Sequence, residues 1–394
     1  MIKVPGFMAS GIYSGVKRSR KKDLALIYSK KPCCTSAVFT KNIVKAAPVI
    51  IGRKKLNRGL CQAIIINSGI ANVCTGKQGI NDANEVTKYL AKNLNVSDSL
   101  VIPSSTGLIG AFLSTHLDSI KSSIPKLISN LSEDGLQTAA EAIMTTDAFP
   151  KFISKQTKFG SRSGTVAAIG KGAGMIAPSM ATMLCFAVTD ISLDKKSQDM
   201  ALKNAVNYSF NKIIVDGDMS TNDTVILMSS GALGNKPIST SSNHYRRFEN
   251  LLTEVLSEIA YKIVEDGEGA TKVAKIIVKG AKSLKDAETI SHTIGTSTLV
   301  KTALYGQDPN WGRIIAAAGR SGVKFNPDKI DLYYGDYLVF RNGMQVMDEK
   351  IAAEKLKPKY LEITLNLKSG KASSHVLTSD LTVDYVKFNS DYHT

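Results

Sequence analysis

The residues with the clearest chemical potential lie in the run KGAGMIAPSMATMLCF, from Lys171 to Phe186. In this run Ala181 precedes Thr182, so a very small side chain leaves the carbonyl of residue 181 open to the neighbouring hydroxyl. An N-to-O acyl shift at this bond would turn it into an ester, and hydrolysis of that ester by water would cut the chain. The α-amino group of the freed Thr182 would titrate at roughly 7.7–8.0, so it could take the hydroxyl proton near neutral pH. The run therefore predicts a self-activating threonine nucleophile, or else only a glycine-rich turn that leads into a buried strand.

A second run, VIPSSTGLIG at residues 101–110, begins as a strand and ends in a glycine-bearing turn. Backbone N–H groups at such a turn, with a threonine hydroxyl beside them, suit the stabilisation of a developing oxyanion. Thr106 and Gly107 are the candidates for this role. The alternative is an ordinary turn between a strand and a helix.

The glycines around Lys171 resemble a phosphate-binding loop only superficially. The residue after the lysine is Gly172 rather than Ser or Thr, and Pro178 interrupts the helix that a nucleotide loop requires. The sequence predicts instead a tight turn toward Thr182, which leaves Lys171 as a cation available for a carboxylate.

Three further segments carry polar side chains that could bind a ligand. The run DGDMSTNDT at residues 216–224 is rich in oxygen ligands but lacks the glutamate of a calcium loop, which favours a hydrogen-bonded turn. Glu268 lies between two glycines, where it could pair with a substrate ammonium or simply end a helix. The C-terminal run 380–394 alternates apolar and polar residues to its end, so we expect this end to be packed and to line a site with Asn389 and Thr394.

These residues must be positioned by a mixed α/β protein, because short β-branched runs alternate with longer amphipathic stretches. The predicted strands are Asp23–Ser29, Ser36–Thr40, Ala63–Asn67, Thr165–Ile169, Thr182–Val188, Thr224–Ser229, Lys272–Val278, Lys329–Tyr334 and Tyr360–Leu367. The predicted helices are Asn81–Leu94, Thr115–Leu131, Leu136–Met144, Leu193–Phe210, Ser242–Val264 and Leu284–Leu304.

Composition excludes several classes of protein. The chain has 394 residues, of which 43% are hydrophobic and 21% charged, as is usual for globular proteins. No apolar run approaches the roughly 18 residues that cross a bilayer, and the N-terminus lacks the apolar core of a signal peptide, so we expect a cytoplasmic protein without a membrane partner. The net charge is +16. Its one dense cluster, KRSRKK at residues 17–22, has no interleaved aromatic residues, which favours a solvated loop over a nucleic-acid site.

Metal and histidine chemistry also lack a signal in the sequence. The five cysteines form no Cys-x-x-Cys pair, and the five histidines show no spacing typical of metal ligands. We therefore expect no metal site and no Ser-His-Asp triad, which favours a nucleophile that needs no histidine.

Taken together, these segments resemble the ornithine acetyltransferases of arginine biosynthesis, also called glutamate N-acetyltransferases. The resemblance covers essentially the whole chain. It is carried by GFMASGIYSGVK, FTKNIVKAAPV, INSGIANVCTG, SSTGLIG, MTTDAFPK, KGAGMIAPSMATML, FNKIIVDGDMSTNDT, DGEGATK, DPNWGRIIAAAGRSG and DYVKFNSDYHT. Departures are few: Ile70 and Val73 stand in a segment that commonly reads NSGNANA, and Gln307 replaces a frequent alanine.

The resemblance implies a role for each candidate residue. The precursor would cleave itself between Ala181 and Thr182, and Thr182 would then carry the acetyl group. Thr106 and Gly107 would form the oxyanion pair. The implied substrate contacts are Thr145, Thr146, Lys171, Thr182, Glu268, Asn389 and Thr394.

The resemblance also implies an architecture and a reaction. The fold would be an N-terminal-nucleophile-like layered sandwich, shared with the D-aminopeptidase group. Chains 1–181 and 182–394 would be interleaved in one structural unit, and two such heterodimers would form a heterotetramer. The acetyl group would pass from N2-acetyl-L-ornithine to L-glutamate with no bound cofactor, and use of acetyl-CoA as a second donor stays open. The alternative reaction is that of an aminopeptidase or amidase with water as the acceptor.

Overall fold

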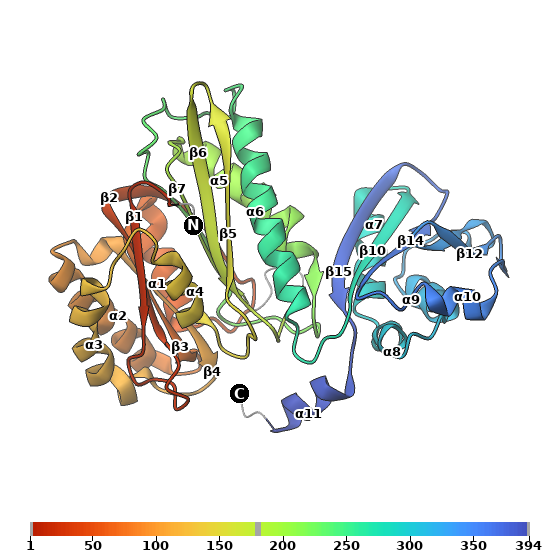
Figure 1. Cartoon of the computed structure of the whole chain (residues 1–394), viewed down its shortest axis with the longest axis horizontal. Coiled ribbons are helices and arrows are strands. Elements are labelled where there is room, and N and C mark those ends of the chain that lie inside the picture. The colour runs from red at the N-terminus through yellow and green to blue at the C-terminus, as the bar shows by residue number, and fades with distance from the viewer. Residues whose placement is uncertain (1–2, 178–182, 392–394) are drawn as a thin grey trace.

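The computed structural model describes residues 3–177 and 183–391, and two β-sheets with their helices make up most of it (Figure 1). The predicted mixed α/β class is confirmed. The predicted cleavage site at Ala181 and Thr182, and the predicted contact Thr394, lie outside the described residues.

The first sheet interleaves strands from before and after residue 182. Strands β7 (Leu184–Thr189) and β9 (Thr224–Ser229) lie in the middle of the sheet, between β2 (Leu24–Phe39) on one side and β6 (Arg162–Lys171) on the other. β7 pairs antiparallel with β6, and β9 pairs antiparallel with β2. In order across the sheet the strands are β4 (Val101–Leu108), β3 (Leu60–Ile70), β2 (Leu24–Phe39), β9 (Thr224–Ser229), β7 (Leu184–Thr189), β6 (Arg162–Lys171) and β5 (Lys151–Phe159), with β1 (Phe7–Ile12) paired to β2.

The alternation of side chains along these strands builds a core on each face of the sheet. On β2, Ala25 and Ile27 pack toward α4 (Leu136–Ile143), whereas Leu24 and Leu26 belong to the core under α2 and α3. The same alternation on β7 sends Cys185 toward α5 and α6. The helices on that side are α2 (Gly76–Leu94), α3 (Leu117–Ser129), α5 (Lys195–Tyr208) and α6 (Tyr245–Glu265), and α1 (Ala47–Lys55) packs near β4.

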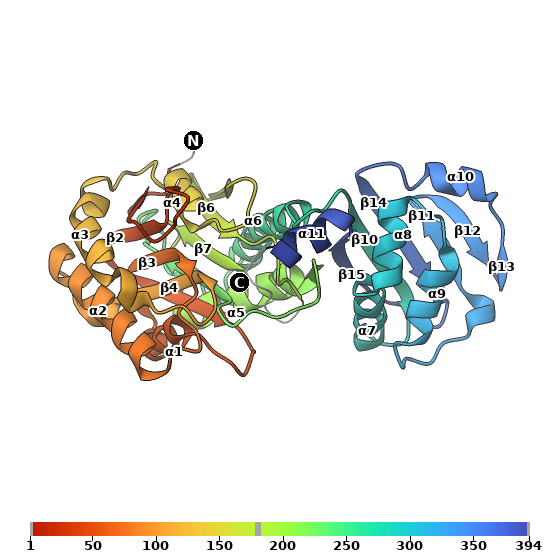
Figure 2. The same cartoon turned by 90° about the horizontal axis from the view of Figure 1, so that it is seen from below.

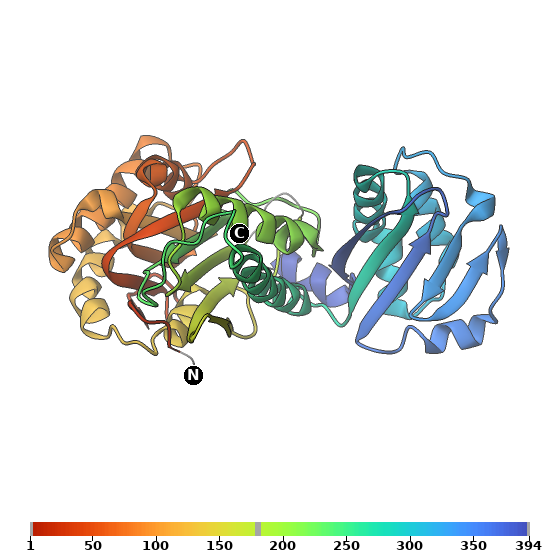
Figure 3. The same ribbon diagram turned by 90° about the horizontal axis from the view of Figure 1, so that it is seen from above.

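The second sheet forms a separate lobe with its own core (Figures 1 and 3). Its strands are, in order, β13 (Met344–Gln345), β12 (Tyr337–Arg341), β11 (Asp331–Tyr334), β14 (Tyr360–Asn366), β10 (Val273–Ala281), β15 (Ala372–Ser379) and β8 (Ile213–Ile214). The helices α7 (Leu284–Gly295), α8 (Thr298–Gly306), α9 (Trp311–Gly319) and α10 (Glu349–Glu354) contribute to this core. The interleaving thus concerns the first sheet, and the second sheet is built from residues after 182.

The last described helix, α11 (Val383–Asp391), leaves the second lobe and lies between the two sheets (Figures 1 and 2). It brings Tyr385 and Asn389 close to the ends of β4 and β6 and to the loop after α6.

Candidate active site

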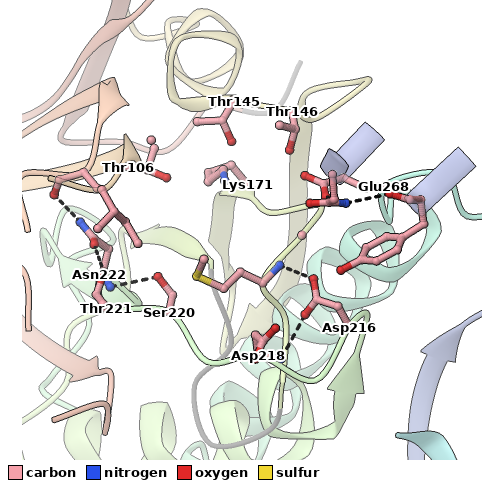
Figure 4. Close-up of a pocket in the computed structure, with 17 residues that line it drawn as sticks. Thr106, Thr145, Thr146, Lys171, Asp216, Asp218, Ser220, Thr221, Asn222 and Glu268 are labelled. Carbon is pink, nitrogen blue, oxygen red and sulfur yellow. Dashed lines mark hydrogen bonds between the residues drawn. The ribbon is translucent and has the colours of Figure 1, made fainter. Parts of the chain in front are cut away.

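A cavity of about 270 Å³ lies at the ends of β4 and β6 (Figure 4). Its walls come from segments that are far apart in the sequence, including the loop after α4, the loop after α6 and helix α11. The described residues that the sequence analysis proposed all line it: Thr106, Gly107, Thr145, Thr146, Lys171, Glu268 and Asn389. In Figure 4, Thr106 and Glu268 lie on opposite sides of the view, with Lys171 between them.

The wall that carries Thr106 and Gly107 is formed by the parallel pairing of β4 with β3. Gly107 lies opposite Gly69 at a shift in the register, and its φ of +129° is strained for a residue with a side chain. A Cβ atom on Gly107 would lie 2.3 Å from the carbonyl carbon of Gly69. Only glycine therefore allows the two strands to approach this closely, and the approach places Thr106 and the Gly107 backbone at the cavity.

Asn222 ties this wall to the segment 216–224. Its side-chain amide donates to the carbonyl oxygens of Ala71 at 2.7 Å and Ser105 at 2.8 Å, and the Thr221 hydroxyl donates to its Oδ1 atom at 2.6 Å. The segment is therefore the hydrogen-bonded turn that its sequence favoured. Its cavity-lining residues were not predicted as site residues, although their density of Asp, Ser, Thr and Asn was a signal.

Asp216 fixes the backbone that approaches the predicted cleavage site. Its carboxylate accepts from the N–H groups of Met175 at 2.5 Å, Ile176 at 2.8 Å and Asp218 at 3.1 Å. Burial raises the pKa of Asp216, and these N–H groups act against that rise. Because Met175 has a φ of +58°, this anchoring also holds a tight turn of the kind that the glycine-rich run predicted.

Lys171 is the last residue of β6 and is 3% exposed. Burial lowers its pKa, and the carboxylate of Asp147, whose Oδ2 atom lies 3.9 Å from its Nζ atom, opposes this effect. Asp147 also accepts from the N–H groups of Thr145 and Gly172, each at 2.8 Å. Burial alone would raise the pKa of Asp147, but Lys171 and Lys151 hold it well below its usual range.

Glu268 lies over the glycine-rich turn on the opposite side. Its N–H group donates to the carbonyl of Ala173 at 2.9 Å, and the side-chain amide of Asn389 donates to its Oε2 atom at 3.0 Å. A Cβ atom on Gly174 would lie 2.5 Å from the same oxygen, so the absence of a side chain at Gly174 leaves space for the Glu268 carboxylate. With Asp216 and Asp218 nearby, the described residues that line the cavity include one buried lysine and several carboxylates, which suits an amino acid that bears an additional ammonium group.

The expectation of a packed C-terminal end is wrong for the described part of that end. Residues 383–391 form helix α11, none of whose side chains is buried, and Val383 is 66% exposed. The Thr382 hydroxyl accepts from the N–H group of Tyr385 at 3.1 Å, which favours a helix over the extended chain that alternation suggests. Only Tyr385 and Asn389 of this helix line the cavity.

Asp223 is a further residue that the sequence analysis missed. It is fully buried, and its Oδ1 atom accepts from the N–H group of Met183 at 3.1 Å. Burial raises the pKa of Asp223 well above its usual value, opposed by the Met183 N–H group, the Thr40 hydroxyl and Lys171. A buried carboxyl group with a raised pKa thus lies beside the first described residue after the predicted cut.

The described part of the chain contains neither a cluster of metal ligands nor a membrane-spanning helix. No group of three or more His, Cys, Asp or Glu side chains there is placed to hold a metal ion. No helix among residues 3–177 and 183–391 combines the length and apolar character needed to cross a bilayer.

The chain is similar in sequence and in structure to known proteins. A family model described as the ArgJ family matches residues 8–394. The arginine biosynthesis bifunctional protein ArgJ of Geobacter sulfurreducens is 44% identical over 395 residues, which cover all of both chains. That of Caldanaerobacter subterraneus is 45% identical over 399 residues, which cover 100% of this chain and 98% of the other. A crystal structure of the Bacillus halodurans protein of the same name is 37% identical, covers 52% of this chain and 98% of that one, and superimposes with a TM-score of 0.51.

Proposed function

The chain belongs to the ArgJ family, and from this premise we propose that it transfers the acetyl group of N2-acetyl-L-ornithine to L-glutamate in arginine biosynthesis. Membership of the family confirms the predicted resemblance and the predicted type of fold. The observation that carries the proposal is the cavity, where a candidate oxyanion pair, a buried cation and a carboxylate come together from separate segments.

In the proposed reaction, Thr182 is the nucleophile. Its α-amino group takes the hydroxyl proton while the oxygen attacks the acetyl carbonyl of N2-acetylornithine. Thr106 and the Gly107 backbone stabilise the oxyanion of the tetrahedral intermediate. The C–N bond then breaks, the proton passes to the departing amine of ornithine, and an acetyl ester of Thr182 remains. The neutral amine of glutamate then attacks this ester, and the C–O bond to Thr182 breaks. One amine proton passes through the α-amino group to the Thr182 oxygen, which regenerates the hydroxyl, and N-acetylglutamate leaves.

Recognition in this proposal follows from the charges of the cavity. Lys171 holds the α-carboxylate that ornithine and glutamate share. Glu268, which Asn389 orients, holds the side-chain ammonium of ornithine. Thr145 and Thr146 contribute hydroxyl groups between these two positions, and we keep Thr394 as a further proposed contact.

The mature protein would consist of residues 1–181 and 182–394, produced by self-cleavage before Thr182. The pairing of β6 with β7 supports a stable product, because six residue pairs, from Val166↔Thr189 to Lys171↔Leu184, join the two pieces across the cut. We further propose a cytoplasmic heterotetramer of two such pairs. The relatives are named "bifunctional", which supports a second activity. We propose that in this second activity acetyl-CoA is the acetyl donor, and that the protein binds no cofactor.

A transfer assay tests this function directly. The purified protein is incubated with N2-acetylornithine, with and without glutamate, and N-acetylglutamate, ornithine and acetate are measured. We expect N-acetylglutamate and ornithine in equal amounts and little acetate. Acetate release that glutamate does not suppress would favour the amidase alternative, and the absence of both products would refute the proposal.

Glu268→Gln should affect the KM values of the two substrates differently. Loss of the carboxylate removes the partner of the ornithine ammonium, so we expect the KM for N2-acetylornithine to rise about tenfold, whereas the KM for glutamate stays within about twofold. Glu265→Gln is the matched control, because Glu265 pairs with Lys359 and Tyr360 and does not line the cavity. Equal changes in both KM values would contradict the proposed role of Glu268.

A further inference from the structure

Three charged side chains are buried together behind the cavity wall: Asp147, Lys151 and Asp266. The Lys151 ammonium lies 2.7 Å from the Oδ1 atom of Asp147 and 2.5 Å from the Oδ2 atom of Asp266. The side chains of Asp147 and Lys151 are fully buried, and that of Asp266 is 4% exposed. No residue of this cluster lines the cavity, and the proposed mechanism uses none of them.

The carboxylates of this cluster also hold the backbone of the segments that do line the cavity. Asp147 accepts from the N–H groups of Thr145 and Gly172, so it joins the loop after α4 to the end of β6. Asp266 lies two residues before Glu268. Its Oδ2 and Oδ1 atoms accept from the N–H group of Ala148 at 3.1 and 3.2 Å. The cluster therefore connects three substrate-facing segments.

The charges of the cluster do not balance by themselves. Two carboxylates face one ammonium, and an uncompensated charge inside a protein is strongly unfavourable. The nearest additional cation is Lys171, whose Nζ atom lies 3.9 Å from Asp147. Lys171 thus completes a group of two negative and two positive side chains, and it is the member that reaches the cavity.

We propose that Asp147 is a positioning residue for acetyl transfer, which orients Lys171 and the Thr145–Thr146 segment toward the α-carboxylate of the substrate. This inference rests on the proposed function. Asp147 acts through Lys171 and two backbone N–H groups, and it does not itself touch the substrate.

The charged groups around Lys171 determine the direction in which each substitution should shift its pKa. Burial lowers the pKa of Lys171, Asp147 raises it, Lys151 lowers it, and Glu268 and Asp223 raise it. Lys17 is a further cation close enough to interact with Lys171. Removal of the Asp147 charge therefore favours the neutral amine of Lys171, which cannot bind a carboxylate by charge. Removal of the Lys151 charge acts in the opposite direction.

The test compares Asp147→Asn with Lys151→Met by measuring kcat/KM for N2-acetylornithine as a function of pH. Asparagine keeps an acceptor oxygen but loses the charge. We therefore expect the alkaline limb of the kcat/KM profile to move to lower pH by about one unit. We also expect the KM values of both substrates to rise about tenfold, because both carry the α-carboxylate. Lys151→Met should move the same limb upward, with Asp266 taking up a proton since burial already raises its pKa.

Asp331→Asn is the matched control for loss of a buried charge. Asp331 is 3% exposed and pairs with Lys368 at 2.6 Å and Arg341 at 3.3 Å in the second lobe. We expect this variant to lose thermal stability without a shift in the pH profile. A merely structural role of Asp147 predicts the same for Asp147→Asn.

The possible results distinguish failure of this inference from failure of the proposed acetyl transfer. Active wild-type protein with an unshifted limb in Asp147→Asn overturns the inference alone. If Asp147→Asn does not fold, Lys151→Met decides. An alkaline limb of Lys151→Met that stays in place or moves to lower pH also overturns the inference. Wild-type protein that transfers no acetyl group refutes the proposed function, and the inference falls with it.

Discussion

Thr182→Ala is expected to leave the 42.4 kDa chain unbroken and to lower acetyl transfer by at least ~10⁴-fold. The same hydroxyl has two proposed tasks, first to attack the carbonyl of residue 181 and later to carry the acetyl group. Its loss therefore removes the cut, the nucleophile and the α-amino base together. Intact-mass analysis measures the cut, and the transfer assay with N2-acetylornithine and glutamate measures the rate.

Thr182→Ser is the control, because serine keeps a hydroxyl at the same position. We expect this variant to give two fragments, of residues 1–181 and 182–394, and to retain measurable transfer. Two fragments from the alanine variant, or full activity of an unbroken wild-type chain, would contradict the proposed mechanism.

The strands of the first sheet could be predicted because their side chains alternate or run uniformly apolar. Thr224–Ser229 was predicted with the bounds that the structure has for β9. Two other predicted strands, Asp23–Ser29 and Ser36–Thr40, are parts of the single strand β2, which spans Leu24–Phe39. The exposed residues between them interrupt the apolar pattern where the pairing of β2 with β3 shifts register, so the sequence suggested a break.

Helix boundaries depended on capping that the periodicity did not reveal. The predicted helix Leu284–Leu304 is two helices, α7 and α8. The Ser297 hydroxyl accepts from the N–H group of Val300 and starts α8, although the apolar pattern continues across the break. Strand β15 of the second lobe was not predicted, because its antiparallel partner β10 lies far back along the chain. Strand β12 was not predicted either, although it forms a local hairpin with β11.

The seven described site residues that the resemblance implied lie at one cavity, but the residues that hold them in place could not be predicted. Asp266 meets Lys151 across 115 positions of sequence, and Asn222 meets Ser105 across 117. Such pairings leave no spacing pattern in the chain. A sequence shows which side chains can do chemistry more readily than which buried charges orient them.

Gly107→Ala should cost about 10²- to 10³-fold in kcat, the effect typical of losing one oxyanion donor. The Cβ atom of alanine would meet the carbonyl carbon of Gly69 at 2.3 Å, and a backbone atom cannot move aside as a flexible side chain can. β4 must therefore shift away from β3, and the Gly107 N–H group moves with it. The substrate carboxylate is bound elsewhere, so we expect KM to change by less than about threefold.

Gly110→Ala provides the matched control on the same segment. Gly110 also has a positive φ, of +82°, but a Cβ atom there would have no neighbour within 4 Å. It should lose about 1 kcal/mol of stability from backbone strain and keep its kcat. Thermal unfolding and steady-state kinetics of both variants separate the two effects. Similar kcat values for the two variants would mean that strain, rather than the close approach of β4 to β3, governs this wall, and that Gly107 has no special place in the reaction.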